Sequence, residues 1–255
     1  MGKLEDALGG GDFPNAMPEA PDLTVPQQMA VAARLLAHDD YALDVAGHIT
    51  VVRPDGDGSM WCTPYGLWWR ELTASDIIVL DAEGAVIEGR WDVTPAVFIH
   101  TEIHKARPDA PVLLHNHPYY GSLLSTLHIA PEIIDQQSCM FDGDVLLFDE
   151  YTGGVDDAEG GDYLASAIGQ ANAVILANHG VLIAGATTAQ AAYRAMTFER
   201  TCRLNYDALI SGQKPVPVPP ETRELLKRSI NTLSVDYYWG GAVRHLLATE
   251  PEVLD

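Results

Sequence analysis

The sequence has few cysteines and no long apolar run. Its 255 residues include three cysteines, Cys62, Cys139 and Cys202, which lie far apart and form no Cys-x-x-Cys pair. A disulfide framework is therefore not expected, and a reducing cytoplasm fits this cysteine usage. No run of about 18 apolar residues is present, and the polar, acidic N-terminus lacks a signal-peptide core. The sequence thus predicts a cytoplasmic protein without a membrane span.

Positive charge is also scarce. Lysine and arginine together number 15 against 36 acidic residues, which gives a formal net charge of -21. Such a surface repels nucleic acid and anionic lipid, so neither is an expected partner. A small-molecule substrate is expected instead, and a bound metal would supply the local positive charge that an anionic substrate needs.

The order of expected elements favours one α/β domain with a mixed or antiparallel sheet. Residues 1–24 are rich in glycine, proline and acid and predict a flexible arm, followed by a single domain over 25–255 that ends in a C-terminal tail. The expected helices cover residues 27–38, 94–106, 121–127, 160–170, 188–210 and 220–232. The expected strands cover residues 47–52, 59–62, 76–80, 85–88, 112–115, 144–148, 173–177 and 181–184.

Three histidines follow two of these apolar strands. His115 and His117 flank Asn116 after the run 111–114, and His179 follows the run 173–176 within Asn178-His179-Gly180. Alternate residues of a strand point to one face, so His115 and His117 can reach one point together. Three convergent imidazoles make a divalent metal site with open positions. The alternative is that they are isolated polar residues in loops.

These histidines belong to a set of ordered motifs that resembles the class II aldolase/adducin family over roughly residues 27–210. The motifs that carry the likeness are Ala46-Gly47-His48-Ile49-Thr50, Thr63-Pro64-Tyr65-Gly66, Glu71-Leu72-Thr73-Ala74-Ser75-Asp76-Ile77, Glu88-Gly89, Arg107-Pro108-Asp109-Ala110, His115-Asn116-His117-Pro118 and Ala177-Asn178-His179-Gly180.

The resemblance implies a three-layer α/β/α fold with a central, mostly antiparallel sheet. It also implies a homo-oligomer, since many members are tetramers with active sites between neighbouring subunits. His115, His117 and His179 would bind a divalent ion, with zinc first and iron or manganese as alternatives. The metal would polarise a carbonyl, and in the sugar-phosphate aldolases a glutamate acts as base or further ligand.

The aldolase glutamate is missing here. Counting back from Arg107 without a gap places its position at Ala96. Glu102 lies six residues further, about 240° around a helix and off that face. His100 and His104, at i+4 and i+8, lie near the face instead. His100 is the candidate for a fourth ligand or an acid/base group, with a core histidine as the alternative.

The expected phosphate site is altered as well. His48 stands where the aldolases have asparagine, and Thr94-Pro95 replace paired serines, of which proline has no N–H to donate. A sugar phosphate is therefore not expected. His48, Thr94 and Tyr65 are candidates for binding another substrate. The pattern resembles an adducin-like subgroup whose relatives include decarboxylases of aromatic acids and iron-dependent oxygenases.

Four further residues are candidates for the site. Tyr120 directly follows the first metal strand and would offer an aromatic wall or a catalytic hydroxyl, with core packing as the alternative. Asp135 and Gln136 lie where family members bring in polar groups. Tyr238 is similar in place to a C-terminal tyrosine that some aldolases use as a proton carrier, with tail packing as the alternative.

A decarboxylase-type lyase ranks first, with a non-phosphorylated hydroxy or oxo acid as its substrate and aromatic acids among the candidates. Decarboxylation needs an electron sink and a proton donor, whereas retro-aldol cleavage also needs a base, which Ala96 cannot be. Alternatives are a class II aldolase, a mononuclear iron oxygenase on the same three histidines, and a non-catalytic adducin-like interaction protein.

Overall fold

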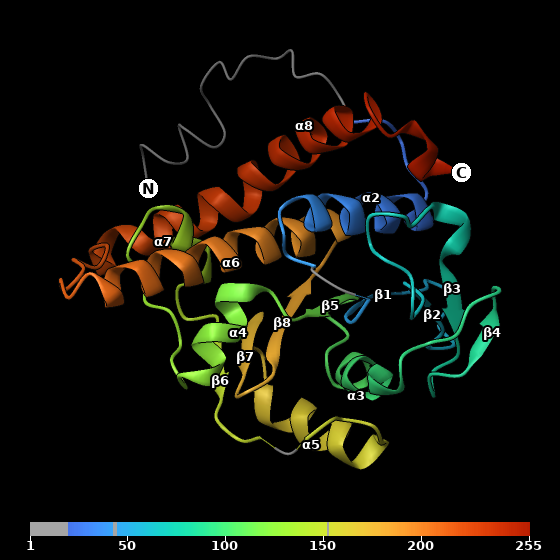
Figure 1. Cartoon of the computed structure of the whole chain (residues 1–255), viewed down its shortest axis with the longest axis horizontal. Helices are drawn as coiled ribbons and strands as arrows, with labels where there is room; N and C mark the ends of the chain where they lie inside the picture. Colours follow the sequence, from blue (N-terminus) through green and yellow to red (C-terminus); the bar gives the residue numbers. More distant parts are fainter. Residues whose placement is uncertain (1–19, 43–44, 152) are drawn as a thin grey trace.

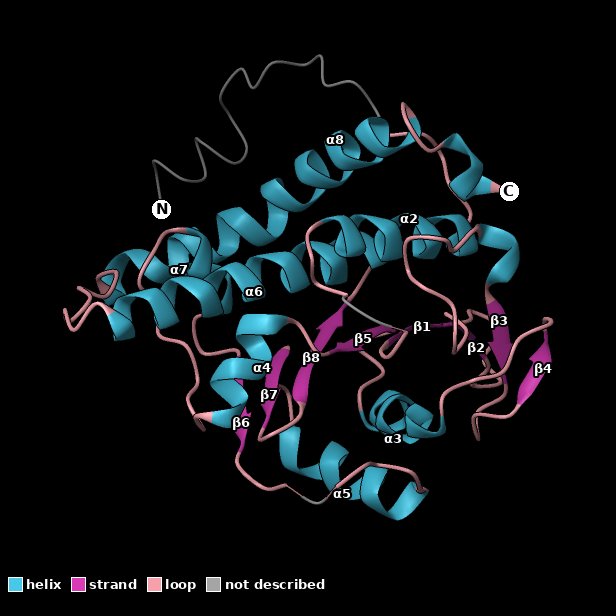
Figure 2. Cartoon of the chain, viewed as in Figure 1, coloured by secondary structure: helices cyan, strands magenta, loops and turns pink. Residues whose placement is uncertain are grey.

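An eight-stranded sheet lies at the centre of the computed structural model, which describes residues 20–42, 45–151 and 153–255 (Figures 1 and 2). The strands run in the order β4-β3-β2-β1-β5-β8-β7-β6. Their bounds are β1 (His48–Val52), β2 (Met60–Cys62), β3 (Ile78–Leu80), β4 (Val86–Glu88), β5 (Val112–Asn116), β6 (Val145–Phe148), β7 (Ala173–Leu176) and β8 (Gly180–Gly185). All neighbouring pairs are antiparallel except β6 and β7, which are parallel.

Helices cover both faces of the sheet. They are α2 (Val25–His38), α3 (Phe98–Ala106), α4 (Tyr119–Thr126), α5 (Ala158–Ile168), α6 (Thr188–Ile210), α7 (Pro220–Ser229) and α8 (Val235–Leu247). Helices α3 and α5 lie on one face, and α2, α4 and α6 lie on the other, with α8 packed outside α2 and α6 (Figure 2). The predicted three-layer α/β/α fold is confirmed.

Each central strand contributes side chains to two hydrophobic cores, one on each face of the sheet, which explains its unbroken apolar run. In β5, Val112 and Leu114 pack into the core under α2 and α6, whereas Leu113 packs into the core under α3 and α5. Successive strand residues point to opposite faces, so a strand covered on both sides needs apolar residues throughout. His115 follows Leu113 by two positions and therefore points toward α3.

The N-terminal arm can be followed only at its end. Residues 20–24 are described, and Thr24 caps α2: its side chain accepts from Gln27 N–H while the Gln27 side chain accepts from Thr24 N–H. The rest of the predicted flexible arm, residues 1–19, lies outside the described residues.

The predicted C-terminal tail is wrong, because the chain there is helical. After α7, one π-helical turn (Ile230–Ser234) leads directly into α8. Tyr238 therefore lies inside a helix. Val235, Trp239 and Val243 are buried at a spacing of four residues, which gives α8 an apolar stripe against the layer below.

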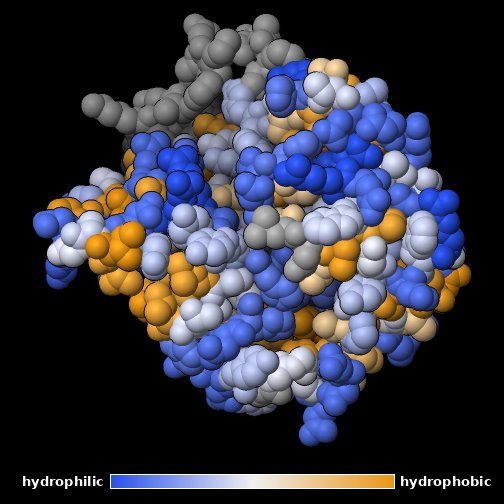
Figure 3. Space-filling model, in the orientation of Figure 1, coloured by the Kyte–Doolittle hydropathy of each residue, from blue (hydrophilic) through white to orange (hydrophobic). Residues whose placement is uncertain are grey.

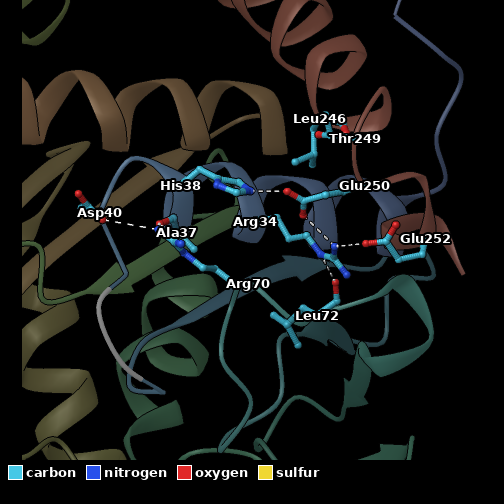
Figure 4. Close-up of polar contacts among 10 residues, drawn as sticks. All are labelled: Arg34, Ala37, His38, Asp40, Arg70, Leu72, Leu246, Thr249, Glu250 and Glu252. Atoms are coloured by element: carbon cyan, nitrogen blue, oxygen red, sulfur yellow. Dashed lines mark hydrogen bonds and ion pairs between the residues drawn. The ribbon is translucent and has the colours of Figure 1, made fainter.

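The end of the chain is tied to α2 by a buried arginine (Figure 4). Arg34 donates to Glu250 at 2.9 Å, to Glu252 at 2.7 Å and to the Leu72 carbonyl at 2.9 Å. His38 contacts Glu250 at 2.6 Å. These contacts hold the last turn (Pro251–Leu254) against the first described helix. Within the described part of the chain, no helix has the length and apolar character to cross a membrane.

Candidate metal centre

Three histidines from two neighbouring parts of the sheet converge at one point. One ring nitrogen from each of His115, His117 and His179 lies within 4.8 Å of the others. Their ring centroids are 4.9 to 5.0 Å apart. In residues 20–42, 45–151 and 153–255, no other group of three histidine, cysteine or acidic side chains comes together in this way. The predicted cluster therefore forms.

Local geometry explains the convergence. His115 and His117 leave the same face at the end of β5. His179 sits in the short loop between β7 and β8, which closes where Leu176 pairs with Gly180. Asn178 has a left-handed backbone, with φ of 55°, as a tight loop of this kind requires. The loop thereby delivers His179 to the end of the neighbouring strand.

The donor set suits a divalent metal ion. His115 Nδ1 lies 3.0 Å from the Val181 carbonyl, which can only accept, so the proton is on Nδ1 and the Nε2 lone pair is free for an ion. Burial and neighbouring histidines hold the pKa of His115 well below its usual range. Burial, then His117, lowers the pKa of His179 to about 4. Neutral imidazoles at neutral pH are the form that binds zinc, iron or manganese.

A second group of histidines extends this site into the protein. His48 pairs with His115 across β1 and β5, and their ring centroids are 5.6 Å apart. On its other side, the His48 ring lies 3.9 Å from the ring of His100. Burial, then His117, lowers the pKa of His48 to about 3. The two candidates predicted from the sequence therefore lie beside the metal cluster and beside each other.

Thr50 holds the far end of this group and was not among the site residues predicted from the sequence. Its hydroxyl lies 2.7 Å from His100 Nδ1 and 2.7 Å from His104 Nε2. Thr50 is two positions after His48 and so shares its face of β1, while His100 and His104 are one turn apart on α3. The alternation His48-x-Thr50 was the available signal.

Access to the cluster comes from one side. His48 is 1% exposed, His100 0% and His115 2%, whereas His117 and His179 are partly exposed. A substrate would thus approach past His117 and His179, with His48 and His100 beneath. Helical spacing predicted that Glu102 does not replace the aldolase glutamate. In the structure its carboxylate pairs with Lys105 at 2.9 Å.

Two predicted substrate-binding residues have other contacts. Thr94 Oγ1 accepts from Ala96 N–H at 3.3 Å and so caps the turn that leads into α3. Tyr65 is about half exposed, and its N–H donates to the Asp92 carbonyl.

The remaining four candidates lie on the α6 side of the sheet. The Tyr120 ring lies 6.1 Å from the ring of Tyr206 and under Arg203. Tyr238 Oη donates to Met196 Sδ at 2.6 Å, and burial raises its pKa. Asp135 caps a short 3-10 turn through Ser138 N–H, and exposed Gln136 precedes that turn. The contacts described for these four residues are with the α6 side of the molecule, and none of those contacts is with a histidine.

Tyr120 instead borders a cleft of about 540 Å³ between α2, α4 and α6. Its lining includes Tyr41, Tyr119, Glu199, Arg200 and Arg203 but none of the histidines. Glu199 accepts from the N–H groups of Tyr120 at 2.7 Å and Gly121 at 2.8 Å. It therefore caps α4 directly after the metal strand.

Comparison with known proteins identifies the family of the chain. The model of the class II aldolase and adducin N-terminal domain matches residues 27–206. The chain is 32% identical to "Decarboxylase NovR" of Streptomyces niveus, over 80% of this chain and 76% of that protein. It is 31% identical to "4-hydroxy-3-prenylphenylpyruvate oxygenase/4-hydroxy-3-prenylbenzoate synthase" of Streptomyces roseochromogenus subsp. oscitans, over 80% and 74%.

Solved structures show the same architecture. "L-fuculose 1-phosphate aldolase from Glaciozyma antarctica PI12" superimposes with a TM-score of 0.79 at 30% identity, covering 91% of this chain and 92% of that one. The family model covers more than two thirds of the chain, and two relatives are more than 30% identical over 80% of it. The chain belongs to the class II aldolase/adducin family.

Proposed function

We propose that this protein is a metal-dependent carbon–carbon lyase that decarboxylates a non-phosphorylated hydroxy or oxo acid. The observation that carries the proposal is a cluster of three histidines, with no carboxylate among its described members and with His48 and His100 beside it. His115, His117 and His179 would hold the ion. When bound, the ion supplies a Lewis acid that stabilises negative charge on a substrate oxygen by several kcal/mol, roughly.

The surrounding residues argue against a phosphorylated substrate. The Thr94 hydroxyl is engaged in capping, and Pro95 has no N–H to offer a phosphate. By its resemblance to the family, His48 occupies the position where the sugar-phosphate aldolases have asparagine. A carboxylate that enters past His117 and His179 needs no such cradle, because the metal site itself attracts it.

Water is the proton source, and the inner histidines can only orient or relay it, because burial keeps them uncharged at neutral pH. Breaking the bond to CO2 leaves an electron pair on carbon, which then takes a proton. The His48 ring packs against the ring of His115, and the His100 ring packs against the other side of His48. We therefore propose that His48 contacts the substrate. His100, which is held by Thr50, would act indirectly by positioning His48. One relative is named a decarboxylase, which supports the reaction. The name of the other contains a phenylpyruvate and a benzoate, which supports an aromatic acid as substrate.

Assay of purified protein with a panel of aromatic hydroxy and oxo acids, with and without oxygen, tests the proposal. We expect CO2 release that continues anaerobically and stops after chelation. His117→Ala should abolish zinc binding and reduce turnover by at least about a thousandfold, since the loss of several kcal/mol raises the barrier directly. Turnover that persists without metal would contradict the proposal.

An iron oxygenase is the second candidate. Three histidines leave positions open for oxygen, and the relative with 31% identity is named an oxygenase. This alternative predicts stoichiometric iron in protein purified without chelator and strict dependence on oxygen. Zinc, manganese or cobalt together with anaerobic turnover would support the lyase.

We further propose that the protein is a homo-oligomer, a tetramer by resemblance. Apolar side chains are exposed at the end of α6 and beyond it, namely Leu209, Ile210, Val216 and Leu225. Figure 3 shows hydrophobic residues gathered on the side where Figure 1 places the ends of α6 and α7. Size-exclusion chromatography with light scattering measures the molar mass in solution and tests this proposal. The mass of a monomer would contradict it.

A further inference from the structure

Two residues with unusual backbones meet beside the metal cluster. Among the described residues, three that are not glycine have positive φ angles: Asp40 at 56°, His128 at 55° and Asn178 at 55°. The left-handed region costs such residues free energy and is retained mainly where the surroundings enforce it. Two of the three are bonded to each other, since His128 Nε2 donates to Asn178 Oδ1 at 2.9 Å.

His128 stands where a helix normally ends in glycine. Leu127 caps the C-terminus of α4, and His128 follows in the left-handed conformation that glycine adopts without strain. The histidine ring is thereby placed between two oxygen acceptors. Nδ1 contacts a carboxylate oxygen of Asp149, the residue after β6, and Nε2 reaches Asn178.

Asn178 immediately precedes the metal ligand His179. Its N–H donates to the Ser125 carbonyl of α4 at 3.2 Å, so both its backbone and its side chain are tied to that helix and the residue after it. Ala177 N–H donates to the Phe148 carbonyl of β6 at 3.0 Å. The loop that carries His179 is thus held by the ends of α4 and β6, with His128 linking the two.

We propose that His128 is a positioning residue for the metal site: the chain Asp149–His128–Asn178, here called the loop clamp, fixes the loop so that His179 points at His115 and His117. The strain at His128 and Asn178 is retained because this geometry needs it. The inference rests on the metal site of the proposed function, but it concerns the affinity and geometry of that site and not the substrate.

His128→Gly separates a role at the metal site from a role in folding. Glycine removes the clamp and also removes the backbone strain. We expect the thermal midpoint to stay unchanged or rise, while the affinity for Zn²⁺, measured against a chelating dye, falls by about 10- to 100-fold as for other partners of metal ligands. The visible absorption bands of bound Co²⁺ should shift. A lowered midpoint with unchanged affinity and unchanged bands would overturn the inference.

Matched variants complete the test. Asp40→Gly relieves the same backbone strain away from the histidines and should leave Zn²⁺ affinity at the wild-type value. Asp149→Asn keeps the shape of the clamp without its charge and should give an affinity between wild type and His128→Gly; it carries the test if His128→Gly does not fold. Wild type that bound no Zn²⁺ would defeat the proposed function, whereas wild-type affinity in both clamp variants would defeat this inference alone.

Discussion

At the scale of single residues, Gly180 marks the closest approach between the loop that carries His179 and strand β5. A Cβ atom there would lie 2.6 Å from the Asn116 carbonyl oxygen and 2.6 Å from His117 Cδ2. Real Cβ atoms do not approach neighbours so closely, and one of the two neighbours is backbone. Gly180 is therefore required by space and not by its backbone angles.

Gly180→Ala should displace His117 and weaken the metal site. We expect Zn²⁺ affinity to fall by about tenfold or more, comparable to the loss of a partner of a metal ligand. Titration calorimetry on protein first treated with chelator measures it. Gly241→Ala is the matched control, because its Cβ would meet only Arg244 at 3.9 Å. Equal affinities of the two variants would contradict the explanation.

Residues of the site differ in how visible they are in the sequence. His115, His117 and His179 follow apolar runs at the spacing of a strand, so they were predictable, and helical spacing pointed to His100. Thr50 was missed because threonine in a strand is ordinary. His128 was missed because a left-handed backbone cannot be read from a histidine, which enters that region only when tertiary contacts enforce it.

At the scale of elements, helix α4 begins without a cap from its own end. Pro118 precedes it and offers no side-chain hydrogen bond. The carboxylate of Glu199, from the middle of α6, accepts the free N–H groups of Tyr120 and Gly121 instead. An acidic group at this end also interacts favourably with the helix dipole. The start of α4, and with it the end of β5, is fixed by α6.

Glu199→Ala should destabilise the fold. Two partly buried N–H groups would lose their acceptor, which costs about 1–3 kcal/mol by the usual range for such groups. Urea unfolding followed by circular dichroism measures the change. The stability of Glu199→Gln should lie between that of Glu199→Ala and that of wild type, because the amide oxygen still accepts one hydrogen bond. Wild-type stability in the alanine variant would show that water replaces the carboxylate.

The elements were predicted unevenly. The central strands were found because a strand buried on both faces carries an unbroken apolar run. Helix α8 was missed because Gly240 and Gly241 disfavour a helix by propensity, and Ser234 at its start makes no side-chain cap. Packing of Trp239 and Val243 on the layer below overrides that propensity, and such contacts are not visible before the fold is known.

At the scale of the whole molecule, folding buries several histidines in the uncharged form. In the folded protein the pKa of His48 is about 3, and those of His104 and His179 are about 4, with burial the main cause in each. The unfolded chain has histidine pKa values near 6.5. Between these values the unfolded state binds more protons, so acid favours unfolding.

Metal-free protein should therefore lose stability as the pH falls from about 6.5 to about 4, and should show no histidine-dependent change above about 7. A shift from 6.5 to about 4 corresponds to about 3 kcal/mol for one fully buried histidine such as His104. Urea midpoints across this range measure the effect. A flat profile between pH 7 and 4.5 would contradict it.

The position of the histidines on the sheet has a consequence for maturation in the cell. His48, His115 and His179 come from strands or loops far apart in the chain, and they meet only after β1, β5, β7 and β8 have paired. Pairing of such distant segments is slow and comes late in folding. An ion held by His115, His117 and His179 would therefore join a scaffold that is already folded. On the proposed function, cells starved of metal should accumulate folded, inactive protein that becomes active on later supply, and uptake of metal during refolding should report completion of the sheet.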